Sequence, residues 1–343
     1  MKAEYIIGII VLGLVGIGLV VLFVSPNPSA PEGGDAAQAL SYREIVNPSG
    51  FVNTEGITLG ELVGEKVILV DFLTYSCINC QRTFPYLNAW YEKYKDQGLE
   101  IVGIHTPEFA FERDIDNVRQ AMKRFGITHP IVLDNDYATW RAYGNTYWPR
   151  KYLIDINGYI VYDHIGEGAY DETERAIQAA LTERNTRLGE EMDVPSDIVD
   201  PEDKITVDSS GVGTPELYFG SRRNSYLANG TPGVDGVQTF VIPETALPNA
   251  LYLGGTWTIT PEYAEGTGSA DIVLRYRAKN IYMVASAADG TTVTVKIDGE
   301  ETKTFSIQAE ELYTLQEGSA YGEHTITVHS DSAGLRVFTF TFG

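Results

Sequence analysis

The pattern of apolar and polar residues divides most of the chain into three stretches. Residues Tyr5–Val24 are apolar and uncharged, and they are long enough to cross a bilayer as a helix. Residues 40–185 alternate apolar runs with runs of helical spacing. Residues 205–343 show short runs of alternating apolar and polar positions, separated by turn residues. The pattern therefore predicts a transmembrane helix, an α/β domain and an all-β domain.

The stretches between these three have the composition of linkers. Residues 25–39 are rich in Pro, Gly, Ala and Ser, as flexible tethers are. Residues 186–204 are acidic and contain two prolines. We therefore predict a membrane anchor over 1–24, a first domain over 40–185 and a second domain over 205–343.

The α/β stretch is predicted to form a mixed sheet with helices on both faces. The expected strands are Val67–Leu73, Leu99–His105, Ile131–Leu133, Lys151–Ile156 and Tyr159–Ile165. The expected helices are Gln81–Gln97, Asp114–Phe125, Asp136–Tyr143 and Asp171–Arg184. Asn157-Gly158 predicts a hairpin turn between the last two strands, because both residues tolerate positive φ.

The last stretch is predicted to be a β-sandwich or jelly roll. Its expected strands are Leu217–Phe219, Thr256–Ile259, Asp271–Tyr276, Ile281–Ala285, Thr292–Ile297, Glu311–Leu315, Glu323–His329 and Leu335–Phe342. Several aromatic residues of this stretch are candidates for a platform on which sugar rings stack, although aromatic residues in short strands more often belong to the core. These candidates are Tyr218, Tyr226, Trp257, Tyr276 and Tyr282.

The distribution of charge excludes one class of partner and predicts on which side of the membrane the domains lie. The formal net charge of −22 argues against nucleic acid, whose phosphates such a protein would repel. Lys2 precedes the apolar stretch, whereas the first basic residue after it is Arg43. The positive-inside bias then places the amino terminus in the cytoplasm and both domains on the extracytoplasmic side of the membrane. A long signal peptide that is cleaved remains the alternative to an anchor.

The two cysteines of the chain, Cys77 and Cys80, lie between a predicted strand and a predicted helix. The first turn of a helix has unsatisfied N–H groups and the positive end of the helix dipole, and both favour a thiolate. We therefore predict that Cys77 attacks a disulfide and that Cys80, one turn deeper, resolves the mixed disulfide.

Two other interpretations of the cysteine pair are weaker. A structural disulfide usually closes a longer loop, because a short loop stabilises little. A zinc site needs two further ligands at suitable spacing, and the histidines are scattered along the chain. We therefore expect no metal and no cofactor apart from the redox-active Cys77–Cys80 disulfide.

Several features around this motif resemble the thioredoxin superfamily. They are the apolar strand that contains Asp71, the Cys-x-x-Cys motif, Pro85 in the following helix and the pair Trp148-Pro149. The resemblance implies that Asp71 is the buried carboxylate that accepts the proton of the second cysteine, and that Pro149 is the cis-proline opposite the disulfide. A carboxyl group in an apolar strand should have a raised pKa, which suits proton transfer. The alternative for Asp71 is a strand-end aspartate bound to backbone.

Within this superfamily the chain most resembles DipZ/TlpA-type proteins. The resemblance lies in the sequence segments FLTYSCINCQRTFPYL, HPIVLDND and YWPRKYLID. It implies an extracytoplasmic thiol–disulfide oxidoreductase that acts on thiols and disulfides of exported proteins. In the DipZ arrangement a CcdA-like membrane electron carrier precedes the redox domain, and a β-sandwich similar to carbohydrate-binding modules follows it. Residues 214–220 and the terminal FTFTFG resemble that sandwich. A separate CcdA-like electron donor and a glycan ligand are thus implied partners.

The chain departs from these families at several positions. Ser76 stands where thioredoxin has a tryptophan, and Thr83 stands where TlpA-type reductants often carry a glutamate. Glu108 is a candidate substitute for that glutamate as proton acceptor, although a glutamate in such a loop is more often solvated. Thr74-x-x-Cys77 also resembles the active site of peroxiredoxins, but the expected proline is absent at Val70.

The predicted function is that of a membrane-anchored extracytoplasmic oxidoreductase that reduces disulfides in exported proteins. One alternative is a tethered glycan- or protein-binding protein in which the thioredoxin fold is a scaffold. A peroxiredoxin-like thiol peroxidase is the second alternative. The direction of electron flow stays open, because known Cys-x-x-Cys proteins span from about −270 mV to about −120 mV.

Overall fold

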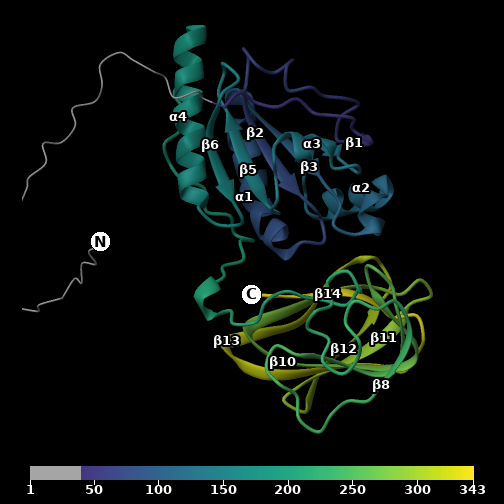
Figure 1. Cartoon of the computed structure of the whole chain (residues 1–343). Coiled ribbons are helices and arrows are strands. Elements are labelled where there is room, and N and C mark those ends of the chain that lie inside the picture. Colours follow the sequence, from purple (N-terminus) through teal and green to yellow (C-terminus); the bar gives the residue numbers. More distant parts are fainter. Residues whose placement is uncertain (1–39) are drawn as a thin grey trace, which may run out of the picture. The chain divides into compact units, whose positions relative to one another are not determined.

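An α/β domain and an all-β domain follow one another in the computed structural model, which describes residues 40–343 (Figure 1). Both domains belong to one unit of mutually contacting residues, Ala39–Gly343. The predicted anchor Tyr5–Val24 lies outside the described residues. Within residues 40–343, no helix combines the length and the apolar character that a membrane crossing requires.

The α/β domain is built on a six-stranded sheet in the order β1-β4-β3-β2-β5-β6. Its strands are β1 (Gly50–Val52), β2 (Val67–Leu73), β3 (Leu99–His105), β4 (Ile131–Leu133), β5 (Arg150–Ile154) and β6 (Ile160–Ile165). Strand β2 runs parallel to β3 and antiparallel to β5, so the sheet is mixed as predicted. The central position of β2 explains why all seven of its residues are buried.

Helices cover both faces of this sheet, as predicted. They are α1 (Ile78–Tyr94), α2 (Ile115–Arg124), α3 (Ala138–Ala142) and α4 (Tyr170–Leu188), with 3₁₀ turns at Lys95–Gln97 and Ala110–Arg113. A further 3₁₀ turn, Ser209–Gly211, lies in the second domain. Phe84 of α1, Val118 of α2 and Ile177 of α4 share one core with Leu69 of β2. Trp140 of α3 belongs to a second core on the other face of the sheet.

Strand β2 contains Asp71, and the alternation of its side chains decides which face of the sheet this residue occupies. Leu69 and Leu73 join the core beneath α1, whereas Val70 and Phe72 join the core on the α3 side. Side chains alternate between the faces of a strand, so Asp71 points to the same side as Leu69 and Leu73. The alternation therefore directs this carboxyl group toward the helix that carries the cysteines.

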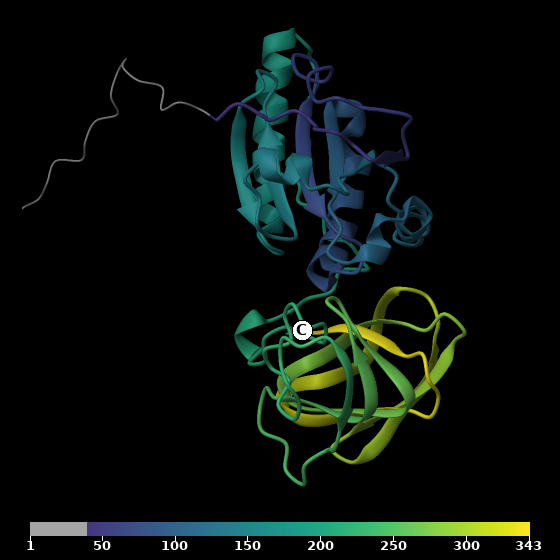
Figure 2. The ribbon, with the colours of Figure 1, turned by 45° about the vertical axis from the view of Figure 1, so that its right-hand side comes forward.

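The second domain is all-β, as predicted (Figure 2). Its eight strands belong to one connected sheet. They are β7 (Leu217–Tyr218), β8 (Gly236–Phe240), β9 (Leu251–Ile259), β10 (Ala264–Ser286), β11 (Thr291–Ile297), β12 (Glu300–Ile307), β13 (Glu311–Ser330) and β14 (Arg336–Phe342). A core of apolar side chains, among them Trp257 and Phe340, fills the domain.

Some strand boundaries of this domain differ from the prediction. The predicted strands 271–276 and 281–285 are parts of the single strand β10, which has register shifts between Ala278 and Asn280 and between Ile281 and Tyr282. A bulge bends a strand without ending it, so one long strand looks like two in the sequence. Strands β8 and β12 were not predicted, because both are largely exposed and lack an apolar face.

The segment predicted as an acidic linker lies against the first domain. Helix α4 continues to Leu188, and Gly189 ends it in the left-handed conformation with φ of 68°. Farther along, the Val199 N–H donates to a carboxylate oxygen of Glu174 (2.8 Å), and Asp197 forms an ion pair with Lys93 (3.1 Å). These contacts fix part of the segment on α1 and α4.

Candidate redox site at the start of helix α1

The two cysteines lie at the amino-terminal end of α1. Cys77 is the N-cap residue with an extended backbone (φ −77°, ψ 120°), and its side chain is half-buried. Cys80 is fully buried in the first turn, and both cysteines are free thiols. Burial raises the pKa of Cys80, and the neighbouring Cys77 acts in the same direction. The outer thiol is thus accessible, whereas the inner thiol needs a base to lose its proton.

The carboxyl group of Asp71 lies in the buried interior behind these thiols. Asp71 has no solvent exposure, and burial raises its pKa to about 7, against the opposing charge of Lys151. Neither carboxylate oxygen has a hydrogen-bond partner among residues 40–343, which rules out the alternative of an aspartate bound to backbone. The predicted raised pKa is confirmed, and it lies where a group can both accept and release a proton near neutrality.

Lys151 is a buried cation that the sequence did not reveal. It is the register partner of Asp71 on β5, and its Nζ donates to the carbonyl oxygen of Gly166 (3.3 Å). Burial lowers the pKa of Lys151, whereas the nearby charges of Asp71 and Cys80 raise it. The amine thus lies within electrostatic range of both the carboxyl group and the inner thiol.

The Trp148–Pro149 peptide bond is cis, as predicted. Pro149 is buried directly before β5. The Trp148 indole N–H donates to the carbonyl oxygen of Thr106 (3.1 Å), and its ring packs on Trp140 with the centroids 4.3 Å apart. The loop is thereby tied to the chain that leaves β3.

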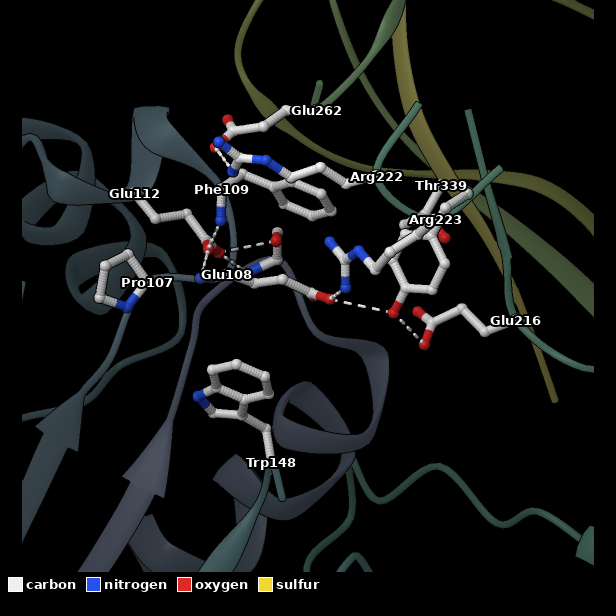
Figure 3. Close-up of polar contacts among 12 residues, drawn as sticks. Pro107, Glu108, Phe109, Glu112, Trp148, Glu216, Arg222, Arg223, Glu262 and Thr339 are labelled. Atoms are coloured by element: carbon white, nitrogen blue, oxygen red, sulfur yellow. Dashed lines mark hydrogen bonds and ion pairs between the residues drawn. The ribbon is translucent and has the colours of Figure 1, made fainter. Parts of the chain in front are cut away.

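Glu112 holds the turn that leads into the cysteines, and sequence reasoning missed it. Its Oε1 accepts from the Ser76 N–H (3.2 Å) and from the Ser76 hydroxyl (2.7 Å). Its Oε2 accepts from the backbone N–H groups of Glu108 (2.6 Å) and Phe109 (3.0 Å), as Figure 3 shows. The side chain is fully buried, and burial raises the pKa of Glu112.

Comparisons with known proteins agree with this geometry. The family described as "Redoxin" matches residues 34–181, and the "Thioredoxin like C-terminal domain" matches residues 214–343. The thiol-disulfide oxidoreductase YkuV of Bacillus subtilis is 30% identical over 140 residues, which cover 41% of this chain and 93% of YkuV. The chain belongs to the thioredoxin-like thiol–disulfide oxidoreductases.

A longer relative extends the similarity over both domains. Protein DipZ of Mycobacterium tuberculosis is 37% identical over 306 residues, or 86% of this chain. The match covers 42% of that protein, so the chain spans about two fifths of its length. The solution structure of a thioredoxin-like protein in the oxidized form is 29% identical, with a TM-score of 0.37, and the match covers 39% of this chain and 90% of that one.

The Glu108 side chain is not solvated, contrary to the ordinary expectation for a glutamate in such a loop. Its Oε1 lies 2.7 Å from Nη1 of Arg223 and 3.0 Å from the hydroxyl of Tyr218, and its side chain is 10% exposed (Figure 3). The guanidinium of Arg223 also stacks on the Tyr218 ring at 3.6 Å. The expectation of a solvated Glu108 was wrong, because residues more than a hundred positions away in the sequence bind its carboxylate. Its role as a substitute proton acceptor stays a prediction.

Arg82 is a second buried cation that the sequence did not reveal. Its side chain in α1 is 1% exposed, and it forms an ion pair with Glu167 (3.1 Å). The same guanidinium donates to the side-chain oxygen of Asn79, which lies between the two cysteines (3.2 Å), and to the carbonyl oxygen of Phe342 (3.3 Å). This arginine therefore links the Cys-x-x-Cys turn to strand β14.

The threonines of the site take ordinary structural positions. Thr74 is buried at the end of β2, and its carbonyl oxygen accepts from the Cys77 N–H (3.4 Å). Thr83 donates its hydroxyl to the carbonyl oxygen of Asn79 (3.0 Å). Peroxidase chemistry at Thr74 therefore stays a prediction. Within the part of the chain that the structure describes, no cluster of His, Cys, Asp or Glu is placed to hold a metal ion.

The aromatic residues of the β domain do not form the platform that was considered. Trp257, Tyr276 and Tyr282 are at most 5% exposed, so the alternative that they belong to the interior is confirmed. Tyr226 is 40% exposed, and Tyr218 lies in the contact with Glu108. The residues therefore do not share one exposed surface.

Proposed function

We propose that this oxidoreductase reduces disulfides in exported proteins through the dithiol of Cys77 and Cys80. One observation carries the proposal: a half-buried thiol begins helix α1, a buried thiol lies in the same turn, and a carboxyl group with a pKa of about 7 lies in the interior behind them. This arrangement supplies a nucleophile, a resolving group and a base, which together suffice for dithiol–disulfide exchange.

The reaction then proceeds in two exchanges. The Cys77 thiolate attacks one sulfur of the substrate disulfide, forms a mixed disulfide and releases the other substrate sulfur as a thiolate, which takes up a proton. Asp71 accepts the proton of Cys80, and the Cys80 sulfur attacks the Cys77 sulfur. The second substrate sulfur leaves and is protonated, so the substrate gains two electrons and two protons while Cys77 and Cys80 form a disulfide.

The direct test is turnover of insulin disulfides by the full-length chain with dithiothreitol as electron source. We expect Cys77→Ser to abolish turnover, because no other residue supplies the attacking sulfur. We expect Cys80→Ser to accumulate mixed disulfides with proteins of an extracytoplasmic extract, because the first exchange still occurs and the second cannot. Turnover that survives Cys77→Ser would show that the catalytic assignment is wrong.

The reducing direction is part of the proposal and has its own test. Its support is the resemblance to TlpA-type reductants in the sequence around the cysteines. Equilibration with glutathione measures the reduction potential, which we expect near the reducing end of the range from about −270 to about −120 mV. A potential near the oxidising end would instead identify a protein that introduces disulfides.

We also propose that the chain is anchored in the cytoplasmic membrane by residues Tyr5–Val24 with both domains outside, and that a CcdA-like membrane protein supplies its electrons. The support is the uncharged apolar stretch and the DipZ-like sequence of the domains. Membrane fractionation and protease digestion of spheroplasts test the location. Release of the chain by a salt wash, or its complete protection from protease, would contradict it.

A glycan ligand of the β domain is the second proposal. It is supported by a cavity of about 320 Å³ whose lining includes Lys279, Gln316, Tyr321 and His324. The buried hydroxyl of Tyr276, a further lining residue, has no hydrogen-bond partner among residues 40–343. Calorimetric titration with cell-wall oligosaccharides should show binding that Tyr321→Ala weakens. Binding that this substitution leaves unchanged would exclude the cavity as the site.

A further inference from the structure

The carboxylate of Glu112 is bound in a way that fits its ionised form. All four of its hydrogen-bonding partners are donors: two groups of Ser76 and the backbone N–H groups of Glu108 and Phe109. A protonated carboxyl group would turn one acceptor into a donor and leave an N–H or O–H group without its acceptor. The arrangement of donors therefore favours the ionised form, against the cost of burial.

This charge is hydrogen-bonded to the residue that directly precedes the nucleophile. Ser76, which receives both hydrogen bonds of Glu112 Oε1, directly precedes Cys77, the N-cap of α1. A negative charge in a buried environment disfavours a second negative charge nearby. Glu112 thus opposes the thiolate that the amino-terminal end of the helix favours, and it does so from a fixed position.

We propose that Glu112 is a positioning residue that fixes the turn before Cys77 and, through its charge, makes the Cys77–Cys80 couple more reducing. The inference rests on the proposed dithiol chemistry and supplies a structural reason for its reducing direction. A disulfide is neutral, whereas the reduced form carries thiolate character. A charge that destabilises the thiolate therefore shifts the equilibrium toward the disulfide, which means that the dithiol gives up its electrons more readily.

The charge of Glu112 has a characteristic dependence on pH. Below its pKa the carboxyl group is neutral and no longer opposes the thiolate, so the effect on the couple should fade as the pH falls. Other titratable or charged groups face this carboxyl group from the elements packed around it. They are Tyr75, Glu108 and Tyr137, and His105 stacks on the Tyr75 ring. His105 is buried with a pKa lowered to about 3, so it stays neutral between pH 5 and pH 8.

The test is equilibration of full-length Glu112→Gln with reduced and oxidised glutathione. Two glutathione thiols form when oxidised glutathione takes two electrons and two protons from Cys77 and Cys80. At pH 8 we expect the equilibrium to shift toward the dithiol by about tenfold relative to the wild type, or about 30 mV in potential. Glu92→Gln, which removes an exposed carboxylate of helix α1, should leave the equilibrium unchanged.

The pH profile separates a charge effect from a structural one. The difference between Glu112→Gln and the wild type should be largest at pH 8 and should shrink toward pH 5, because a lower pH favours the neutral form of a carboxyl group whose pKa is raised by burial. A difference of the same size at both pH values, or no difference at pH 8, would overturn the charge role. Insulin turnover by the wild type tests the dithiol chemistry separately, so that proposal can fail or hold whatever the outcome for Glu112.

A second variant serves if Glu112→Gln does not fold. Ser76→Ala removes only the 2.7 Å hydroxyl donor and leaves the carboxylate in place. With one donor fewer, the ionised form of Glu112 is less stabilised, so its pKa should rise further. In a plot of reduction potential against pH, the slope changes where Glu112 gains its proton. We expect this change of slope at a higher pH in Ser76→Ala than in the wild type. An unchanged curve between pH 5 and pH 8 would overturn the inference.

Discussion

Two buried carboxyl groups flank the cysteine pair, and the protein holds them in opposite ways. Asp71 lies behind Cys80, and neither of its oxygens has a hydrogen-bond partner among residues 40–343. Glu112 binds Ser76, the residue before Cys77, and accepts four hydrogen bonds in all. Burial raises the pKa of both groups, but only at Glu112 do hydrogen bonds stabilise the charged form.

A buried carboxyl group can therefore either exchange a proton or hold a negative charge, depending on its hydrogen-bond partners. A carboxyl group without partners changes its protonation state with little rearrangement, and it suits proton transfer. A carboxyl group surrounded by donors is costly to protonate, because its donors would lose their acceptor. We therefore assign proton transfer to Asp71 and a charge stabilised by hydrogen bonds to Glu112, and the following experiments test this difference.

The largest effect is expected from Asp71→Asn on the second exchange. An amide of nearly the same shape cannot accept the proton of Cys80, whose own pKa is raised by burial. We expect release of the substrate from the mixed disulfide to slow by about a hundredfold at pH 7. Rapid-quench analysis of a preformed mixed disulfide measures this step. A rate within twofold of the wild type would show that another group is the base.

The same substitution should change how stability depends on pH. Asp71 has a raised pKa in the folded state, so the folded protein holds this proton more tightly than the unfolded chain. Its contribution is therefore full below pH 4 and is lost as the pH rises toward 7. Between pH 5 and pH 8 the free energy of unfolding should fall by about 2–3 kcal/mol more in the wild type than in Asp71→Asn. Urea titrations at both pH values measure the difference, and parallel curves would contradict the buried titration.

Lys151→Met should slow release of the substrate at pH 7, but by less than Asp71→Asn. The positive charge lowers the pKa of Asp71 against the effect of burial, so its removal should raise that pKa above about 7. The substrate-release step should then slow about tenfold at pH 7 and recover near pH 9. Lys123→Met, which removes an exposed lysine from α2, is the matched control. A release rate that is slowed equally at pH 7 and pH 9 would indicate a packing defect instead.

The smallest effect is expected at Glu108, the third carboxylate of this region. Its partner Arg223 is 40% exposed, so solvent screens the ion pair. Arg223→Gln should lower the free energy of unfolding by less than about 1 kcal/mol and leave the glutathione equilibrium within twofold. Chemical denaturation and the redox titration check both values. A large change in the redox equilibrium would mean that Glu108 acts on the cysteines, and the contrast between Asp71 and Glu112 would then be incomplete.

The sequence by itself determined the features that depend on local pattern. Alternation and helical spacing predicted the mixed sheet, its helices and the all-β character of the second domain. The Cys-x-x-Cys between a strand and a helix, the aspartate in the apolar strand and the Trp148-Pro149 pair identified the centre of the site. These features lie within short runs of sequence, where the period of the chain fixes which side chains share a face.

Only the tertiary structure decided what surrounds that centre. Lys151 meets Asp71 through strand register, Glu112 reaches Ser76 across 36 positions, and Arg223 reaches Glu108 across 115 positions. A glutamate or arginine has the same appearance in a sequence whether it is solvated or buried. Its partner depends on how distant segments pack, and in this protein that packing decides which carboxyl groups are neutralised, which remain charged and which are free to exchange a proton.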